Sequence, residues 1–234
     1  MTGITPHASP GAYRNTHERI IIENGPGSVV MKLLRSLTLF PALLAVTAAL
    51  AAPAHAFAGL KPLVILMPGA GGPVSSDFVM RNRDRFRAAG FDTKVITVPR
   101  AVANAANLHS GRRKVFLVGV DRGASQIAAA VALGAPADAA VMISGDYGKA
   151  MRTLITPAVL PETLIVHHRQ DRCAQAPSAH ADRFVEWSGS RARVAWMSMP
   201  GKPDRNPCGP FGAHGFYHRD AEPVASIIRF LQTQ

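Results

Sequence analysis

Residues 115–123 read Val-Phe-Leu-Val-Gly-Val-Asp-Arg-Gly and are followed by an alanine-rich segment. The apolar run predicts a buried strand, and the two glycines four positions apart predict a sharp turn from that strand into a helix. Gly119 and Gly123 suit this turn because the residues flanking its apex must be nearly free of side chain. The apex is Asp121, whose carboxylate the turn would project from the carboxyl end of the strand.

Strand-like and helix-like segments alternate along residues 57–234. Apolar runs predict strands at residues 63–67, 93–98, 114–119, 139–144, 163–167 and 193–199. Helix-favouring stretches predict helices at residues 76–89, 100–108, 122–133, 147–157, 176–187 and 222–231. The alternation predicts an α/β fold, a doubly wound, mostly parallel sheet of about six strands with helices on both faces. Ligands bind outside the carboxyl ends of the strands in such sheets, so we expect the functional site there.

Residues 31–56 have the pattern of a secretory signal peptide. Met31 is followed by basic residues, then by an apolar stretch, and then by Ala-His-Ala at 54–56. The apolar stretch is short for a membrane span, and an uncleaved anchor is the alternative. We therefore expect a periplasmic or secreted protein without a membrane span in its mature part. Residues 1–30 would be a disordered upstream extension, and residues 57–234 would form a single domain.

The chain is basic, with a formal net charge of +11. Its densest basic run alternates through a predicted helix, at Arg81, Arg83, Arg85 and Arg87. Such a run can bind an anionic partner, or it can form the solvated face of a helix. No nucleic-acid motif accompanies the run and aromatic residues are sparse, so we favour a solvated face and expect no nucleic-acid partner.

The chain has two cysteines, Cys173 and Cys208. An even number of cysteines in an exported chain predicts a disulfide, and two reduced thiols are the alternative. Neither cysteine belongs to a C-x-x-C pair, so we expect no metal site and no cofactor.

Four motifs stand where predicted strands end or where the last helix begins. They are Pro-Gly-Ala-Gly-Gly at 68–72, the elbow at 119–123, His-His-Arg-Gln-Asp at 167–171 and His-Gly-Phe at 214–216. With its motifs in this order, the chain resembles a small, cap-less member of the α/β-hydrolase superfamily over nearly all of residues 60–234. The first strands of larger members have no counterpart here.

The resemblance implies a role for each motif residue. Asp121 stands at the position of the nucleophile, where the superfamily more often has serine. His214 stands at the position of the general base, and Asp171 at that of the acid that orients the histidine. The oxyanion hole would combine the backbone amide of Arg122 with one from the glycine loop, at Gly69 or Ala70; a merely flexible turn is the alternative for that loop.

Other interpretations stay open for these residues. Asp121 can also cap the helix that follows it. Asp171 can be a turn residue, and Asp146, after the preceding strand, is a second candidate for the acid. We favour Asp171 because a disulfide between the two cysteines would tie its loop to the histidine loop and hold the acid and base in register.

A carboxylate nucleophile suits displacement at a saturated carbon, because attack on an ester carbonyl would form a high-energy mixed anhydride. The elbow resembles that of fluoroacetate dehalogenases, and haloalkane dehalogenases and epoxide hydrolases also use aspartate. We therefore expect a hydrolase that acts on a small molecule, at an ester or a carbon–heteroatom bond, through an Asp-His-Asp triad. The alternatives are a degenerate relative that binds a ligand or partner without turnover, and a serine-type esterase that uses Ser125. The sequence does not determine the oligomeric state.

Overall fold

The computed structural model describes residues 59–198 and 205–234, so the predicted signal peptide and upstream extension lie outside the described residues. The strands are β1 (Leu63–Met67), β2 (Asp92–Val95), β3 (Val115–Val120), β4 (Ala139–Ile143), β5 (Glu162–His168) and β6 (Ala192–Met197). The helices are α1 (Phe78–Arg81), α2 (Arg83–Ala88), α3 (Pro99–Ser110), α4 (Arg122–Ala132), α5 (Tyr147–Leu154), α6 (Ala179–Trp187) and α7 (Ala221–Gln232), with a short 3₁₀ helix η1 (Pro157–Val159).

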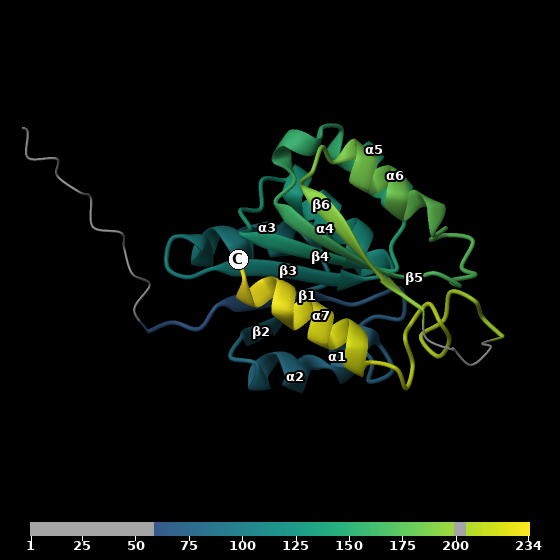
Figure 1. Cartoon of the computed structure of the whole chain (residues 1–234). Coiled ribbons are helices and arrows are strands. Elements are labelled where there is room, and N and C mark those ends of the chain that lie inside the picture. Colours follow the sequence, from purple (N-terminus) through teal and green to yellow (C-terminus); the bar gives the residue numbers. More distant parts are fainter. Residues whose placement is uncertain (1–58, 199–204) are drawn as a thin grey trace, which may run out of the picture. The chain divides into compact units, whose positions relative to one another are not determined.

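All six strands pair in parallel, in the order β2-β1-β3-β4-β5-β6 (Figure 1). Strand β3 lies inside the sheet between β1 and β4, and all six of its residues are buried. Its partners Met67 on β1 and Ile143 on β4 are the last residues of their strands. Asp121 therefore follows β3 at the carboxyl edge of the sheet, where a ligand can approach.

Helices cover both faces of the sheet, as the sequence predicts (Figure 1). Helices α3, α4, α5 and α6 pack on one face, in an apolar cluster that includes Leu117 and Ile127. Helices α1, α2 and α7 pack on the other face, in a cluster that includes Val118 and Ile227. Leu117 and Val118 belong to opposite clusters because successive side chains of a strand alternate between its faces.

The helix expected at residues 76–89 is two shorter helices, which meet at Asn82. Asp77 caps the first of them by accepting hydrogen bonds from the N–H groups of Val79 and Met80. The Asn82 side chain donates to the carbonyl of Phe78, and the Asn82 backbone leaves helical geometry at φ −102° and ψ 3°. A side chain that hydrogen-bonds the preceding turn competes with helix continuation, and this explains the break.

Between β4 and β5 the chain forms only α5 and η1, so no cap-sized insertion covers the carboxyl edge there. No helix among residues 59–198 and 205–234 is both long enough and apolar enough to cross a bilayer.

Candidate active site

The turn after β3 places Asp121 in a backbone conformation that few residues adopt. Its φ is 53° and its ψ is −119°. For a residue other than glycine, such a conformation persists only where the surroundings enforce it. A Cβ atom on Gly119 would lie 2.6 Å from the backbone of Gly123, and one on Gly123 would lie 2.0 Å from the carbonyl oxygen of Met67. Backbone packing therefore holds the turn, and both flanking glycines are sterically required.

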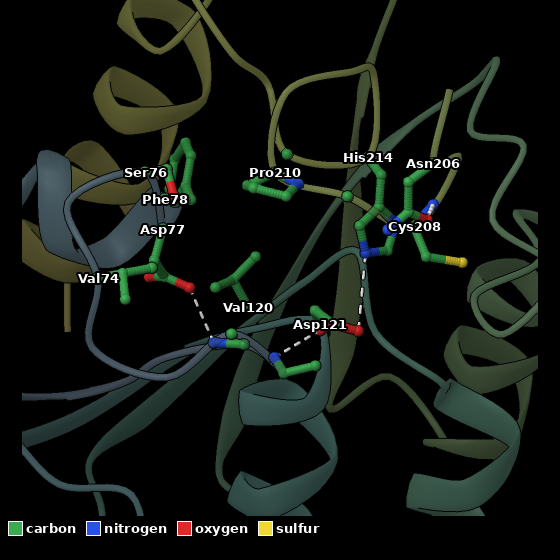
Figure 2. Close-up of a pocket in the computed structure, with 15 residues that line it drawn as sticks. Val74, Ser76, Asp77, Phe78, Val120, Asp121, Asn206, Cys208, Pro210 and His214 are labelled. Carbon is green, nitrogen blue, oxygen red and sulfur yellow. Dashed lines mark hydrogen bonds and ion pairs between the residues drawn. The ribbon is translucent and has the colours of Figure 1, made fainter. Parts of the chain in front are cut away.

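The two oxygens of the Asp121 carboxylate have different surroundings (Figure 2). Oδ2 accepts a hydrogen bond of 2.8 Å from the backbone N–H of Ala70, while Oδ1 lies 3.7 Å from Nε2 of His214. The second distance is an ion-pair separation that is too long for a hydrogen bond. Burial raises the pKa of Asp121, but His214 and the amides of Ala70 and Arg122 outweigh it, so the pKa lies below its ordinary value.

His214 lies between two carboxylates. Its Nδ1 is 2.8 Å from Oδ2 of Asp171, and its Nε2 faces Asp121. Burial alone would lower the pKa of this imidazole, but the charge of Asp121 and the hydrogen bond and charge of Asp171 raise it to about 9. Near neutral pH, the resting site therefore has a protonated His214 between the side chains of Asp121 and Asp171.

Asp171 is a fully buried carboxylate beyond the end of β5. Its Oδ1 accepts a hydrogen bond from the backbone N–H of Cys173, and its Oδ2 is within reach of His214. The predicted disulfide between Cys173 and Cys208 is present. It links the loop that carries Asp171 to the loop that carries His214.

The second acid candidate, Asp146, lies elsewhere in the site. Its carboxylate accepts a hydrogen bond of 2.9 Å from the N–H of Lys149 and caps α5. Ser125, the alternative nucleophile, is buried within α4, beyond the turn that carries Asp121.

A second buried histidine approaches Asp171, and its role is not apparent from the sequence. Nε2 of His167 is 3.5 Å from Oδ2 of Asp171, and Nδ1 is 3.2 Å from the hydroxyl of Tyr147. Burial, reinforced by the charge of His214, lowers the pKa of His167 to about 4 despite the attraction of Asp171. His168 follows it on the opposite face of β5, where its ring lies near Phe216. The only sign of this contact in the sequence was the pair of histidines at the end of a predicted strand.

Asp77 holds the glycine loop in place through a hydrogen bond to its backbone. Oδ2 of Asp77 accepts a hydrogen bond of 2.9 Å from the N–H of Gly69, while Oδ1 caps α1. Burial raises the pKa of Asp77, although the backbone amides of Gly69, Met80 and Val79 oppose this effect. The Gly69 amide is thus turned toward Asp77, and the Ala70 amide is the one that faces Asp121.

Arg81, from the basic run, connects the segment before α1 to the histidine loop. Its guanidinium donates to the carbonyl oxygens of Ser76 and Gly215 and forms an ion pair of 2.7 Å with Asp220. Arg83 instead donates to Thr93. The sequence did not indicate these contacts, because Arg81 and Asp220 are 139 residues apart.

Asp121 and His214 line a cavity of about 210 Å³ (Figure 2). Its other walls include Val74, Phe78 and Pro210, which make it partly apolar. This volume is below the usual range for drug-sized ligands and suits a small molecule. Among residues 59–198 and 205–234, no group of three or more His, Cys, Asp or Glu side chains is arranged to hold a metal ion.

The sequence matches no protein-family model and no curated protein. Solved structures do match the fold. Est1E from Butyrivibrio proteoclasticus is 12% identical with a TM-score of 0.56, over 74% of this chain and 88% of that chain. A structure from the work on the metagenome-derived lipolytic enzymes LipS and LipT is 12% identical with a TM-score of 0.57, over 75% and 95% of the two chains.

A third match is MGS-MChE2, an α/β-hydrolase enzyme from the metagenome of sediments from the lagoon of Mar Chica, Morocco. It is 14% identical with a TM-score of 0.55, over 75% of this chain and 92% of that chain. These similarities agree with the six-stranded parallel sheet and its helices. The chain therefore has the α/β-hydrolase fold.

Proposed function

We propose that the protein is a hydrolase of small molecules in which Asp121 is the nucleophile, His214 the general base and Asp171 the residue that orients His214. One observation carries the proposal: the Ala70 amide already binds Oδ2 of Asp121, while Oδ1 faces His214 and the residue lines the cavity. The carboxylate thus presents one oxygen for attack and keeps the other at hydrogen-bond donors. The fold shared with esterases and lipolytic enzymes is consistent with hydrolysis.

This arrangement favours substrates that react at a saturated carbon. In a serine enzyme the oxyanion hole must be free to receive the carbonyl oxygen of the substrate. Here the Ala70 N–H already donates a hydrogen bond to the Asp121 carboxylate, so the carbonyl oxygen of an ester would have to displace that carboxylate. Displacement at a carbon–heteroatom bond needs no such site in its first step. We therefore place the reaction at a carbon–heteroatom bond rather than at an acyl group.

The proposed reaction has two steps. Oδ1 of Asp121 forms a bond to the substrate carbon as the leaving group departs with the bonding electron pair, which gives an alkyl ester. A water molecule then loses a proton to His214 and attacks Cγ, while the amides of Ala70 and Arg122 stabilise the oxyanion that develops on Oδ2. The intermediate collapses with cleavage of the Cγ–Oδ1 bond. The alcohol product leaves with Oδ1 and a proton, and the carboxylate keeps the oxygen from water.

The charges of the site fit this order of events. His214 is protonated in the resting state because two carboxylates raise its pKa to about 9. Formation of the ester removes the negative charge of Asp121, and with it one of the causes of that raised pKa. His214 then passes its proton to the departed leaving group, or to the oxygen of an opened epoxide ring, and becomes a base at the step that needs one.

A non-catalytic binding protein is the second candidate. The ion pair between Asp121 and His214 and the lack of a cap between β4 and β5 favour it. In this case the cavity would bind a ligand, and the paired charges would only stabilise the site.

Single-turnover reactions in ¹⁸O-labelled water test the proposal, with epoxides, haloacids and esters as substrates. We expect the label in Asp121 after one turnover, measured by mass spectrometry of the peptide that contains it. Asp121→Asn should lose at least a thousandfold in turnover, whereas Asp182→Asn, an exposed carboxylate on α6, should react like the wild type. Product formation without label in Asp121 would refute the nucleophilic role. Ligand binding without any turnover would favour the second candidate.

A further inference from the structure

A second chamber, of about 420 Å³, opens on another side of Asp121. It shares Ala70 and Asp121 with the first cavity, but its other walls come from the start of α4, from α5 and from the segment that leads into α6. A ligand that fills both spaces would therefore pass the carboxylate of Asp121. Neither the disulfide nor His214 lines this second chamber.

Three basic side chains line the chamber: Arg122, Lys149 and Arg152. Within the part of the chain that the structure describes, none of these three side chains forms an ion pair or a hydrogen bond. Other arginines of the protein do have partners, as Arg81 does with Asp220. All three are exposed residues, and cations that gather in a concave space without ion-pair partners attract an anionic ligand rather than stabilise the fold.

His180 adds a fourth nitrogen group to this wall. Its Nδ1 atom is buried and has no hydrogen-bond partner among the described residues. A Cβ atom on Gly148 would lie 3.3 Å from this Nδ1 and 3.4 Å from Nη1 of Arg152. Both nitrogens thus lie close to the side-chain-free surface of Gly148. A buried ring nitrogen without a partner is uncommon, and a ligand or an ordered water beside it is one physical reason for it.

Two carboxylates face the same space, and both already have partners. Asp146 caps α5 through the N–H of Lys149, and Asp121 binds the amide of Ala70 and faces His214. Three cations against two carboxylates leave the wall of the chamber with an excess of positive charge. Arginine binds anionic oxygen groups through paired N–H donors, and lysine adds a point charge.

We infer that the second chamber binds an anionic oxygen group of the substrate, such as a carboxylate, sulfate or phosphate, while the reacting carbon lies at Asp121. The inference rests on the proposed function for its statement about the substrate, but the anion site itself stands on the chamber alone. It assigns Lys149 and Arg152 of α5 to substrate binding, together with the side chains of Arg122 and His180. The substrate would therefore be a small anion with a leaving group on a saturated carbon.

The anion site is tested by calorimetric titration of acetate, sulfate and inorganic phosphate into full-length Asp121→Asn protein at low ionic strength, where surface charges are least screened. This variant is suitable because it removes turnover and one repelling charge. We expect saturable binding of at least one anion, and the three probes show which oxygen group is preferred. Lys149→Gln or Arg152→Gln, each added to Asp121→Asn, should weaken that binding about tenfold.

Arg100→Gln is the matched control, because Arg100 is an exposed arginine on α3 that contacts neither cavity. It should change anion affinity by less than twofold. Equal weakening by Arg100→Gln and Arg152→Gln, or no saturable binding of any of the three anions, would overturn the inference.

The substrate class is tested with a matched pair, an epoxide that carries a carboxylate and its uncharged carboxamide. We expect the wild type to favour the anion about a hundredfold in kcat/KM, mainly through KM, and the Lys149→Gln, Arg152→Gln double variant to lose this preference. Equal turnover of both epoxides, with label in Asp121, would overturn the inference but leave the proposed function intact. Anion binding without any labelling of Asp121 would leave the anion site standing and refute the proposed function.

Discussion

Two buried histidines approach the same oxygen of Asp171, yet their pKa values move in opposite directions. His214 has a second carboxylate, Asp121, on its far side, and its pKa rises to about 9. His167 has the neutral hydroxyl of Tyr147 on its far side, and burial lowers its pKa to about 4. At His167, burial and the charge of His214 outweigh Asp171 at 3.5 Å; at His214, the hydrogen bond to Asp171 and the charge of Asp121 together outweigh burial. The comparison distinguishes a histidine that carries a proton from one that remains neutral.

The largest effect is expected from Asp171→Asn, which removes the carboxylate that both histidines share. Turnover of a substrate that labels Asp121 should fall by about 10³- to 10⁴-fold. The asparagine side chain neither holds the His214 ring in the correct orientation nor stabilises its protonated form. The pKa of both histidines should fall, as followed by NMR of the imidazole protons. Asp146→Asn, at the second acid candidate, should leave the pKa of His214 in place. A fall of that pKa in Asp146→Asn but not in Asp171→Asn would reverse the assignment.

Replacement of both Cys173 and Cys208 by alanine should increase the mobility of the loop that carries His214 more than that of the strand that carries His167. The loss of the cross-link should reduce the free energy of unfolding by roughly 3–4 kcal/mol in the chain-entropy model, measured by denaturant titration. Hydrogen exchange should quicken in the loop of His214 but much less in β5, which carries His167. Equal loss of protection in both segments would show that the disulfide supports the domain as a whole.

The free energy of unfolding should fall on both sides of neutral pH, in an alkaline arm due to His214 and an acidic arm due to His167. His214 holds its proton more tightly when folded, so its contribution is complete below pH 6.5 and is lost as the pH rises toward about 9. His167 resists protonation when folded, so stability is lost as the pH falls from 6.5 toward about 4. Each arm corresponds to about 3 kcal/mol at most.

Denaturant titrations of His214→Gln and His167→Gln across this pH range assign the arms. The first variant should lose the alkaline arm and the second the acidic arm. If both variants keep the wild-type slope in both ranges, the opposite shifts of the two pKa values are wrong.

The smallest effect is expected from Tyr147→Phe. This change removes the hydroxyl beside His167 and its contact of 3.3 Å with the carbonyl of Met142, and it should reduce the free energy of unfolding by about 1 kcal/mol. The pKa of His214 should stay within the error of an NMR titration. A clear shift of that pKa would mean that the two histidines are coupled through Asp171 more strongly than their distances suggest.

Much of this architecture could be predicted from the sequence because it follows from local patterns. The apolar run before Asp121 predicted β3, and alternating segments predicted the parallel sheet with helices on both faces. The break at Asn82 was missed because it depends on one side chain that bonds the preceding turn. Two contacts could not be predicted: the ion pair of Arg81 with Asp220 and the proximity of His167 to Asp171. Only the packing of the folded chain brings these side chains together.

The turn around Asp121 also bears on how such a protein can change in evolution. The backbone around Gly119 and Gly123 leaves no room for a methyl group, so these two positions are closed to variation. The side chain at the apex points away from this packing and contributes little to it. The scaffold therefore tolerates an exchange of the reactive group between its two fixed neighbours. If Asp121 is the nucleophile, as we propose, a lineage can move from a hydroxyl to a carboxylate at this position without rebuilding the fold.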